Sequence, residues 1–72
     1  MSDGPTDDDR RRRLRHDLRS PLTIVAGFAE ILAADKPIGD AARRDYAVRI
    51  QAAAEELRTM LDDFFEDDGN GA

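Results

Sequence analysis

The sequence predicts an all-α protein, an antiparallel hairpin of two helices. Two stretches have apolar residues recurring every three or four positions, and a short segment with a proline and a glycine separates them. Charged residues make up 38% of the chain, which fits helices that bury one stripe and expose the rest. A chain of 72 residues has room for one small domain. We therefore expect a single helical hairpin over residues 7–66.

The first helix is predicted over residues 7–34, after a disordered segment at residues 1–6. Thr6 and Asp9 have the spacing of a capping box, and the acidic residues of the first turn suit the positive end of the helix dipole. These acids precede the arginines of the second turn by four residues, the favourable order for helix ion pairs. The apolar stripe comprises Leu14, Leu18, Leu22, Val25, Phe28 or Ala29, and Leu32.

The second helix is predicted over residues 41–65, after a loop at residues 35–39 that Asp40 closes as a helix cap. Its apolar residues alternate in threes and fours, which is the pattern of a coiled-coil seam. They are Tyr46, Ile50, Ala53, Leu57, Met60 or Leu61, and Phe64. Residues 66–72 are acidic and glycine-rich, so we expect a flexible tail.

A lone hairpin has only one seam, which offers little apolar burial to offset the entropy lost on ordering the whole chain. Two hairpins that pack into a four-helix bundle bury more apolar surface, and twofold dimers are the commonest oligomers. We therefore expect the hairpin to form a homodimer.

The candidate chemistry lies in residues 16–22, His-Asp-Leu-Arg-Ser-Pro-Leu, which contain the one histidine of the chain. Imidazole is the side chain whose ordinary pKa lies near neutrality, so it can act as a nucleophile in water. The adjacent Asp17 can accept a hydrogen bond from one ring nitrogen and leave the other free to attack. A histidine beside an aspartate is, taken alone, more often an ordinary solvated pair.

The helical period places His16 on the face opposite the apolar stripe, so we expect it to be exposed. Small residues share its face and leave a low surface on which another protein could dock: Ser20, Thr23 and Gly27. Ile24 and Ile31 flank this surface; they either form an apolar edge for docking or widen the bundle stripe, and we favour the second. Pro21 removes a backbone donor in mid-helix and should bend or loosen the helix near His16.

Residues 16–23, His-Asp-Leu-Arg-Ser-Pro-Leu-Thr, resemble the H-box of the dimerisation and histidine phosphotransfer (HisKA-type) domain of two-component sensor histidine kinases. The resemblance continues through residues 24–32 and, less specifically, through residues 45–65. It implies a homodimeric four-helix bundle in which His16 is the phosphoacceptor and Asp17 orients the ring and acts as general base. Supporting or partner-docking roles would fall to Arg19, Ser20, Pro21, Thr23 and Gly27.

The function expected from this resemblance is phosphotransfer, in which His16 receives a phosphoryl group and passes it to an aspartate of a response-regulator receiver domain. The chain has no glycine-rich phosphate loop and no cysteine, so we expect it to bind neither ATP nor a metal. Mg²⁺ is expected on the receiver, and ATP on a histidine kinase domain acting in trans. Alternatives are a non-catalytic dimeric protein that docks on receivers or kinases, and an excised kinase fragment. The Met1 start and the tail favour a stand-alone protein.

The arginine run at residues 10–13 resembles a nucleic-acid patch, but the net charge of −5 and the preceding acids favour pairing within the helix. No apolar run approaches the roughly 20 residues that a membrane span needs. The acidic start is unlike a signal peptide. We therefore expect a cytoplasmic protein with neither nucleic-acid nor membrane partners.

Overall fold

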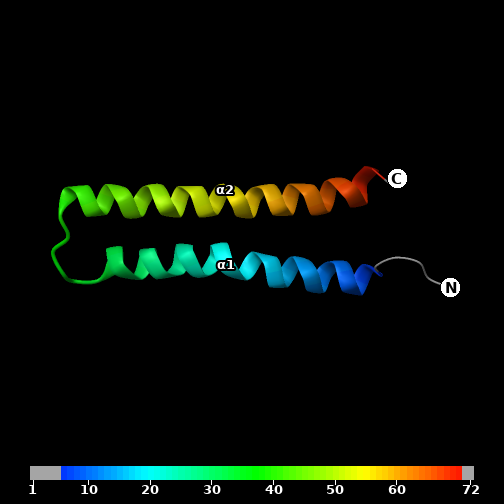
Figure 1. The fold of residues 1–72 in the computed structure, drawn as a ribbon, viewed down its shortest axis with the longest axis horizontal. Coiled ribbons are helices and arrows are strands. Elements are labelled where there is room, and N and C mark those ends of the chain that lie inside the picture. The colour runs from blue at the N-terminus through cyan, green and yellow to red at the C-terminus, as the bar shows by residue number, and fades with distance from the viewer. Residues whose placement is uncertain (1–5, 71–72) are drawn as a thin grey trace.

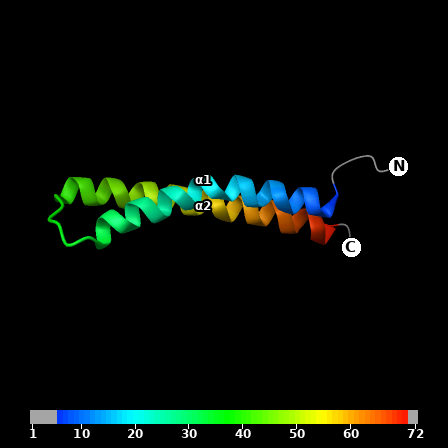
Figure 2. The same cartoon turned by 90° about the horizontal axis from the view of Figure 1, so that it is seen from below.

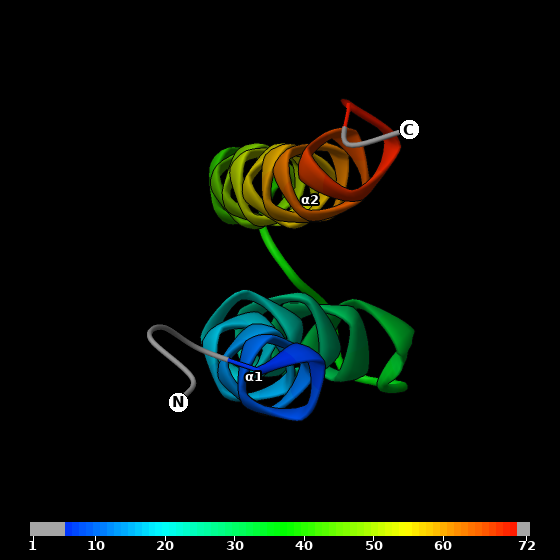
Figure 3. The same ribbon diagram turned by 90° about the vertical axis from the view of Figure 1, so that its right-hand side faces the viewer.

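The computed structural model describes residues 6–70, with side chains described over residues 6–66. Two helices, α1 (Asp7–Ala33) and α2 (Asp40–Asn70), run antiparallel beside each other (Figure 1). Seen from below, the two helices cross near their middle (Figure 2). Seen along the long axis, α1 and α2 form two layers, one helix packed on the other (Figure 3). The hairpin is a rod of 58 × 19 × 13 Å. The predicted all-α hairpin is confirmed.

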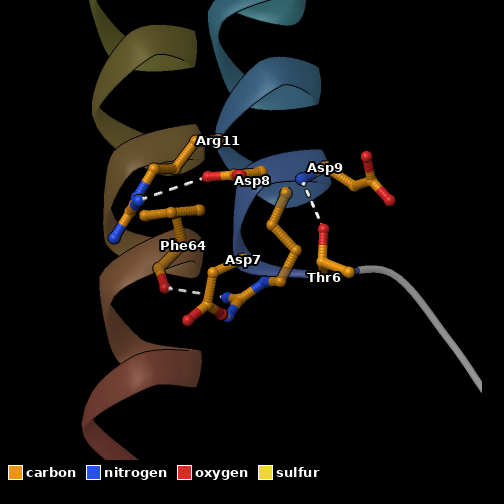
Figure 4. Close-up of polar contacts among 7 residues, drawn as sticks. Thr6, Asp7, Asp8, Asp9, Arg11 and Phe64 are labelled. Carbon is orange, nitrogen blue, oxygen red and sulfur yellow. Dashed lines mark hydrogen bonds and ion pairs between the residues drawn. The ribbon is translucent and has the colours of Figure 1, made fainter. Parts of the chain in front are cut away.

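The start of α1 has the cap that the sequence predicted. The backbone N–H of Asp9 donates to the Thr6 hydroxyl oxygen at 3.1 Å (Figure 4). The acids of the first turn pair with arginines three residues later, at 3.7–3.9 Å, rather than four residues later as predicted. Helical side chains lean toward the N-terminus, so an arginine three residues on reaches back over the short aspartate.

The seam between the helices has heptad spacing on α1, and Pro21 takes a place in it that was predicted for Leu22. Pro21 is fully buried, whereas Leu22 is 51% exposed. A spacing of 3.5 residues per turn selects position 21, because position 22 lies too far round the helix. The seam residues of α1, which are buried or half-buried, are Leu14, Leu18, Pro21, Val25, Phe28 and Leu32.

On α2 the predicted seam is confirmed, and Met60 rather than Leu61 belongs to it. Ala53 is 4% exposed and lies at the centre of the seam, while Leu61 is 38% exposed. Two aromatic contacts join the helices near their ends. Phe28 stacks on Tyr46 with ring centroids 5.0 Å apart, and the Arg10 guanidinium lies 4.9 Å from the centre of the Phe64 ring.

The boundaries differ from the prediction at three places. Helix α1 ends at Ala33, one residue early, and α2 begins at Asp40 itself. The Arg43 N–H donates to the Gly39 carbonyl at 2.9 Å, so Gly39 occupies the cap position and Asp40 is helical. Helix α2 continues to Asn70, so residues 66–70, predicted as part of a flexible tail, are helical. No proline follows Phe65, and acidic residues do not break a helix.

Residues 1–5, predicted to be disordered, and the last two residues of the predicted tail lie outside the described part of the chain. Within the described part, neither helix contains a stretch that is both long and apolar enough to cross a membrane.

Candidate functional site

His16 lies in the first half of α1, on the face directed away from α2. Its side chain is 80% exposed. Behind it, Leu14 and Leu18 are half-buried against α2 and hold this part of the helix in place. The predicted exposure of His16 is confirmed. The ring therefore stands on a supported helix and is open to a second protein.

Asp17 lies beside the imidazole ring, but the two groups are slightly too far apart for a hydrogen bond. The distance from Nδ1 of His16 to Oδ1 of Asp17 is 3.6 Å, whereas an N–H···O hydrogen bond measures about 2.7–3.2 Å. The predicted hydrogen bond is therefore not formed in this arrangement. The carboxylate nonetheless lies on the Nδ1 side, which leaves Nε2 as the ring nitrogen that faces away from it. The Asp17 side chain is 52% exposed and has room to rotate towards the ring.

The small residues predicted to share the face of His16 are all exposed: Ser20, Thr23 and Gly27. A Cβ atom added at Gly27 would meet nothing within 4 Å, so the hairpin itself does not require a glycine there. The surface beside His16 is thus low and open. Arg19 is also exposed, whereas the burial of Pro21 removes it from any docking surface and gives it a packing role.

A hollow of about 380 Å³ adjoins Asp17 between the two helices. Its lining residues are Arg10, Arg13, Leu14, Asp17, Met60, Asp63 and Phe64. The residues that α2 contributes to this hollow were not predicted from the sequence. The antiparallel pairing of the two stripes was the signal that could have found them, because it brings the end of α2 beside the start of α1.

Ile24 and Ile31 are 41% and 43% exposed, so the hairpin does not place them in its seam. Ile24 lines a second hollow of about 310 Å³ with Phe28 and residues of α2. In the described residues, no three histidine, aspartate or glutamate side chains are grouped closely enough to hold a metal ion.

Comparison with known proteins identifies the family. The His Kinase A (phospho-acceptor) domain family matches residues 12–68, which include His16 and both helices. The chain belongs to this family. The resemblance to the HisKA-type domain of two-component histidine kinases is thereby confirmed.

Curated relatives of the chain are histidine kinases and a sensor protein. The cell-division control histidine kinase PdhS of Brucella ovis is 32% identical over 56 residues, which are 75% of this chain and 5% of PdhS. The PdhS protein of Brucella abortus matches equally. The sensor protein VanSC of Enterococcus gallinarum is 36% identical over 53 residues, 74% of this chain and 15% of VanSC. The chain therefore spans a small part of each relative. No solved structure gives a significant match.

Proposed function

We propose that His16 is a phosphoacceptor that receives a phosphoryl group and passes it to an aspartate of a receiver domain. The observation that carries the proposal is the placement of His16: it is 80% exposed, held from behind by the seam, and has a carboxylate 3.6 Å from Nδ1. Membership of the phospho-acceptor family supports the same role. An accessible nucleophile on a fixed helix suits transfer between two proteins, because the partner must align its reacting group with the ring.

The proposed reaction uses the lone pair of Nε2. This nitrogen attacks phosphorus, an N–P bond forms, and the P–O bond of the donor breaks with its electron pair going to the donor oxygen. Nδ1 keeps its proton, and Asp17 stabilises the positive charge that the ring gains. In the onward step a receiver carboxylate oxygen attacks phosphorus, and the N–P bond breaks with its electron pair returning to Nε2.

The partners of the reaction supply what the chain lacks. We propose that ATP, where it is the donor, is held by a histidine kinase domain acting in trans, and that Mg²⁺ is held by the receiver. The chain itself contributes the nucleophile, the neighbouring carboxylate and the docking surface formed by Ser20, Thr23 and Gly27. Because ATP and its kinases are intracellular, we place this function in the cytoplasm.

We further propose that two hairpins associate into a four-helix bundle. A groove of about 480 Å³ runs along one side of the hairpin. Its lining residues are Arg11, Leu14, Arg15, Leu18, Leu22, Phe64 and Phe65. Leu22 and Phe65 are 51% and 61% exposed, so the hairpin leaves large apolar surface in water. Domains of this family form homodimers in general, and a second copy would cover the groove.

A non-catalytic role is the second candidate, because the ring of His16 and the carboxylate of Asp17 are not hydrogen-bonded. In that case the hairpin would occupy receivers or kinases and regulate them by competition. As a third candidate, the chain acts as a piece of a longer kinase whose ATP-binding part is supplied in trans.

The test is phosphate transfer from a panel of phosphorylated receivers and active histidine kinases, with His16→Gln measured alongside. A phosphohistidine bond is labile in acid and survives base, so its stability identifies the linkage. We expect acid-labile label on the wild type and none on His16→Gln, while both bind the partner equally. Label retained on His16→Gln would refute the assignment of His16. Partner binding without any label would establish the competitive role instead.

A further inference from the structure

Most arginines in the described part of the chain contact a neighbouring acid or ring. Those that do are Arg10, Arg11, Arg12, Arg43, Arg49 and Arg58. Arg13, Arg15, Arg19 and Arg44 make no ion pair within the described residues. Three of these four lie within one helical turn of His16, so the unpaired arginines are concentrated around the nucleophile.

The sequence itself creates this concentration. Arg15 and Arg19 have no acid three or four residues away in either direction, and they lie four residues apart from each other. Like charges at this spacing destabilise a helix by about 0.2–0.5 kcal/mol. The arrangement therefore costs the helix stability, and neither side chain forms an ion pair within the described residues.

Arg13 and Arg19 bracket His16 symmetrically. They lie three residues before and three residues after it, which places them about 60° to either side and about 4.5 Å along the axis. Both are exposed.

The surroundings of the two arginines differ. Arg13 lines the hollow beside Asp17, which also contains Asp63, although neither carboxylate comes within ion-pair distance of Arg13. Arg19 shares a hollow of about 390 Å³ with Arg15, Leu22, Thr23 and Ala26, none of which is acidic. Arg15 also lines the groove that contains Leu22 and Phe65, where a second hairpin would cover it.

We propose that Arg13 and Arg19 form an electrostatic docking pair for an acidic surface on the phosphotransfer partner. This inference rests on the proposed function, because that function makes the partner's reacting group a carboxylate or an aspartyl phosphate, both of which are anionic. The net charge of −5 on the whole chain would repel such a partner. The pair reverses the sign of the charge at the one place where the partner must approach, and guanidinium groups bind carboxylates and phosphates in two-point contacts.

The experiment measures the initial rate of phosphate transfer between the hairpin and the receiver that reacts fastest in the panel. The variants are Arg13→Gln, Arg19→Gln, the double variant, and Arg44→Gln as control. Arg44 is also exposed and unpaired but lies near the start of α2, so its replacement removes a positive charge at a distant place. At 25 mM salt we expect the double variant to be slower by about tenfold, within the range known for electrostatic steering. Arg44→Gln should stay within about twofold of the wild type.

Salt supplies the second readout. At 0.5 M salt the screening length falls to about 4 Å, so the wild type and the double variant should converge. A loss in Arg44→Gln as large as that in Arg13→Gln or Arg19→Gln would overturn the proposal, because each of these variants removes one positive charge and net charge alone would then explain all three. Unchanged transfer by the double variant at low salt would also overturn it. Absence of label from the wild type would instead refute the proposed function. The docking pair would then still be tested by receiver binding in the His16→Gln background, where replacing Arg13 and Arg19 should weaken binding at low salt and not at high salt.

Discussion

Replacing Leu22 by alanine should weaken self-association of the hairpin about 50-fold without disturbing its helices. The hairpin leaves Leu22 51% exposed in the groove that also contains Phe65. Leucine to alanine removes three carbon groups, each contributing about 0.8 kcal/mol when fully buried. Burying the exposed half in a dimer therefore contributes about 1.2 kcal/mol per subunit and about 2.4 kcal/mol per dimer. Since about 1.4 kcal/mol corresponds to tenfold in Kd, the loss amounts to about 50-fold.

Val48→Ala is the matched control for this change. Val48 is 55% exposed, much as Leu22 is, but it does not line the groove. Sedimentation over a concentration series gives the dissociation constant of each variant, and circular dichroism checks that the helices are retained. The reasoning is refuted if the wild type sediments as a monomer at micromolar concentration. It is equally refuted if Val48→Ala weakens association as much as Leu22→Ala does.

Three further substitutions test local features, each by thermal unfolding at one fixed protein concentration. Thr6→Ala removes the acceptor of the Asp9 N–H and should lower stability by about 1 kcal/mol; an unchanged melting temperature would mean that the cap contributes nothing. Gly27→Ala should raise stability by about 1 kcal/mol, because a Cβ there meets no atom within 4 Å, and a loss would reveal a contact missing from the hairpin. Ala53→Leu should cost about 1–3 kcal/mol, because Ala53 is 4% exposed in a close-packed seam, and a neutral result would show that the seam has spare room.

The fold could be predicted from the sequence because both helices carry a long apolar period and α1 has a recognisable cap. The choice between Pro21 and Leu22 was wrong for a physical reason. Proline was expected to bend or loosen the helix and was left out of the apolar stripe, yet its ring is fully buried in the seam, and the heptad spacing selects it. The end of α2 was also set too early, because acidic residues weaken a helix without ending it.

The candidate site was predictable in its placement and not in its fine geometry. Helical periodicity alone put His16 on the exposed face, since the apolar stripe fixes which side of α1 meets α2. The 3.6 Å separation between His16 and Asp17 depends on the rotamers of two exposed side chains, which differ by small energies that no sequence pattern records. The hollow beside Asp17 could not be predicted from α1 alone, because its lining residues come from both helices and from opposite ends of the chain.

Pro21 should divide α1 into two halves that open at different rates. It removes the N–H that would donate to the Asp17 carbonyl, directly beside the phosphoacceptor. Each half has one aromatic contact to α2, Arg10 on Phe64 in the half that carries His16 and Phe28 on Tyr46 in the other. The half that carries His16 also holds Arg15 and Arg19, like charges four residues apart that destabilise the helix. We therefore expect amide hydrogen exchange at residues 13–20 to be about tenfold faster than at residues 24–31, which corresponds to about 1.4 kcal/mol of local stability.

Pro21→Ala provides the comparison for this prediction. It restores the missing donor, so the ratio of exchange rates between the two halves should fall even if the loss of the buried ring lowers the stability of the whole hairpin. Equally slow exchange on both sides of Pro21 in the wild type would contradict the argument. Faster exchange confined to the His16 half would mean that the nucleophile can adjust its position towards a partner while the seam beyond Pro21 stays packed.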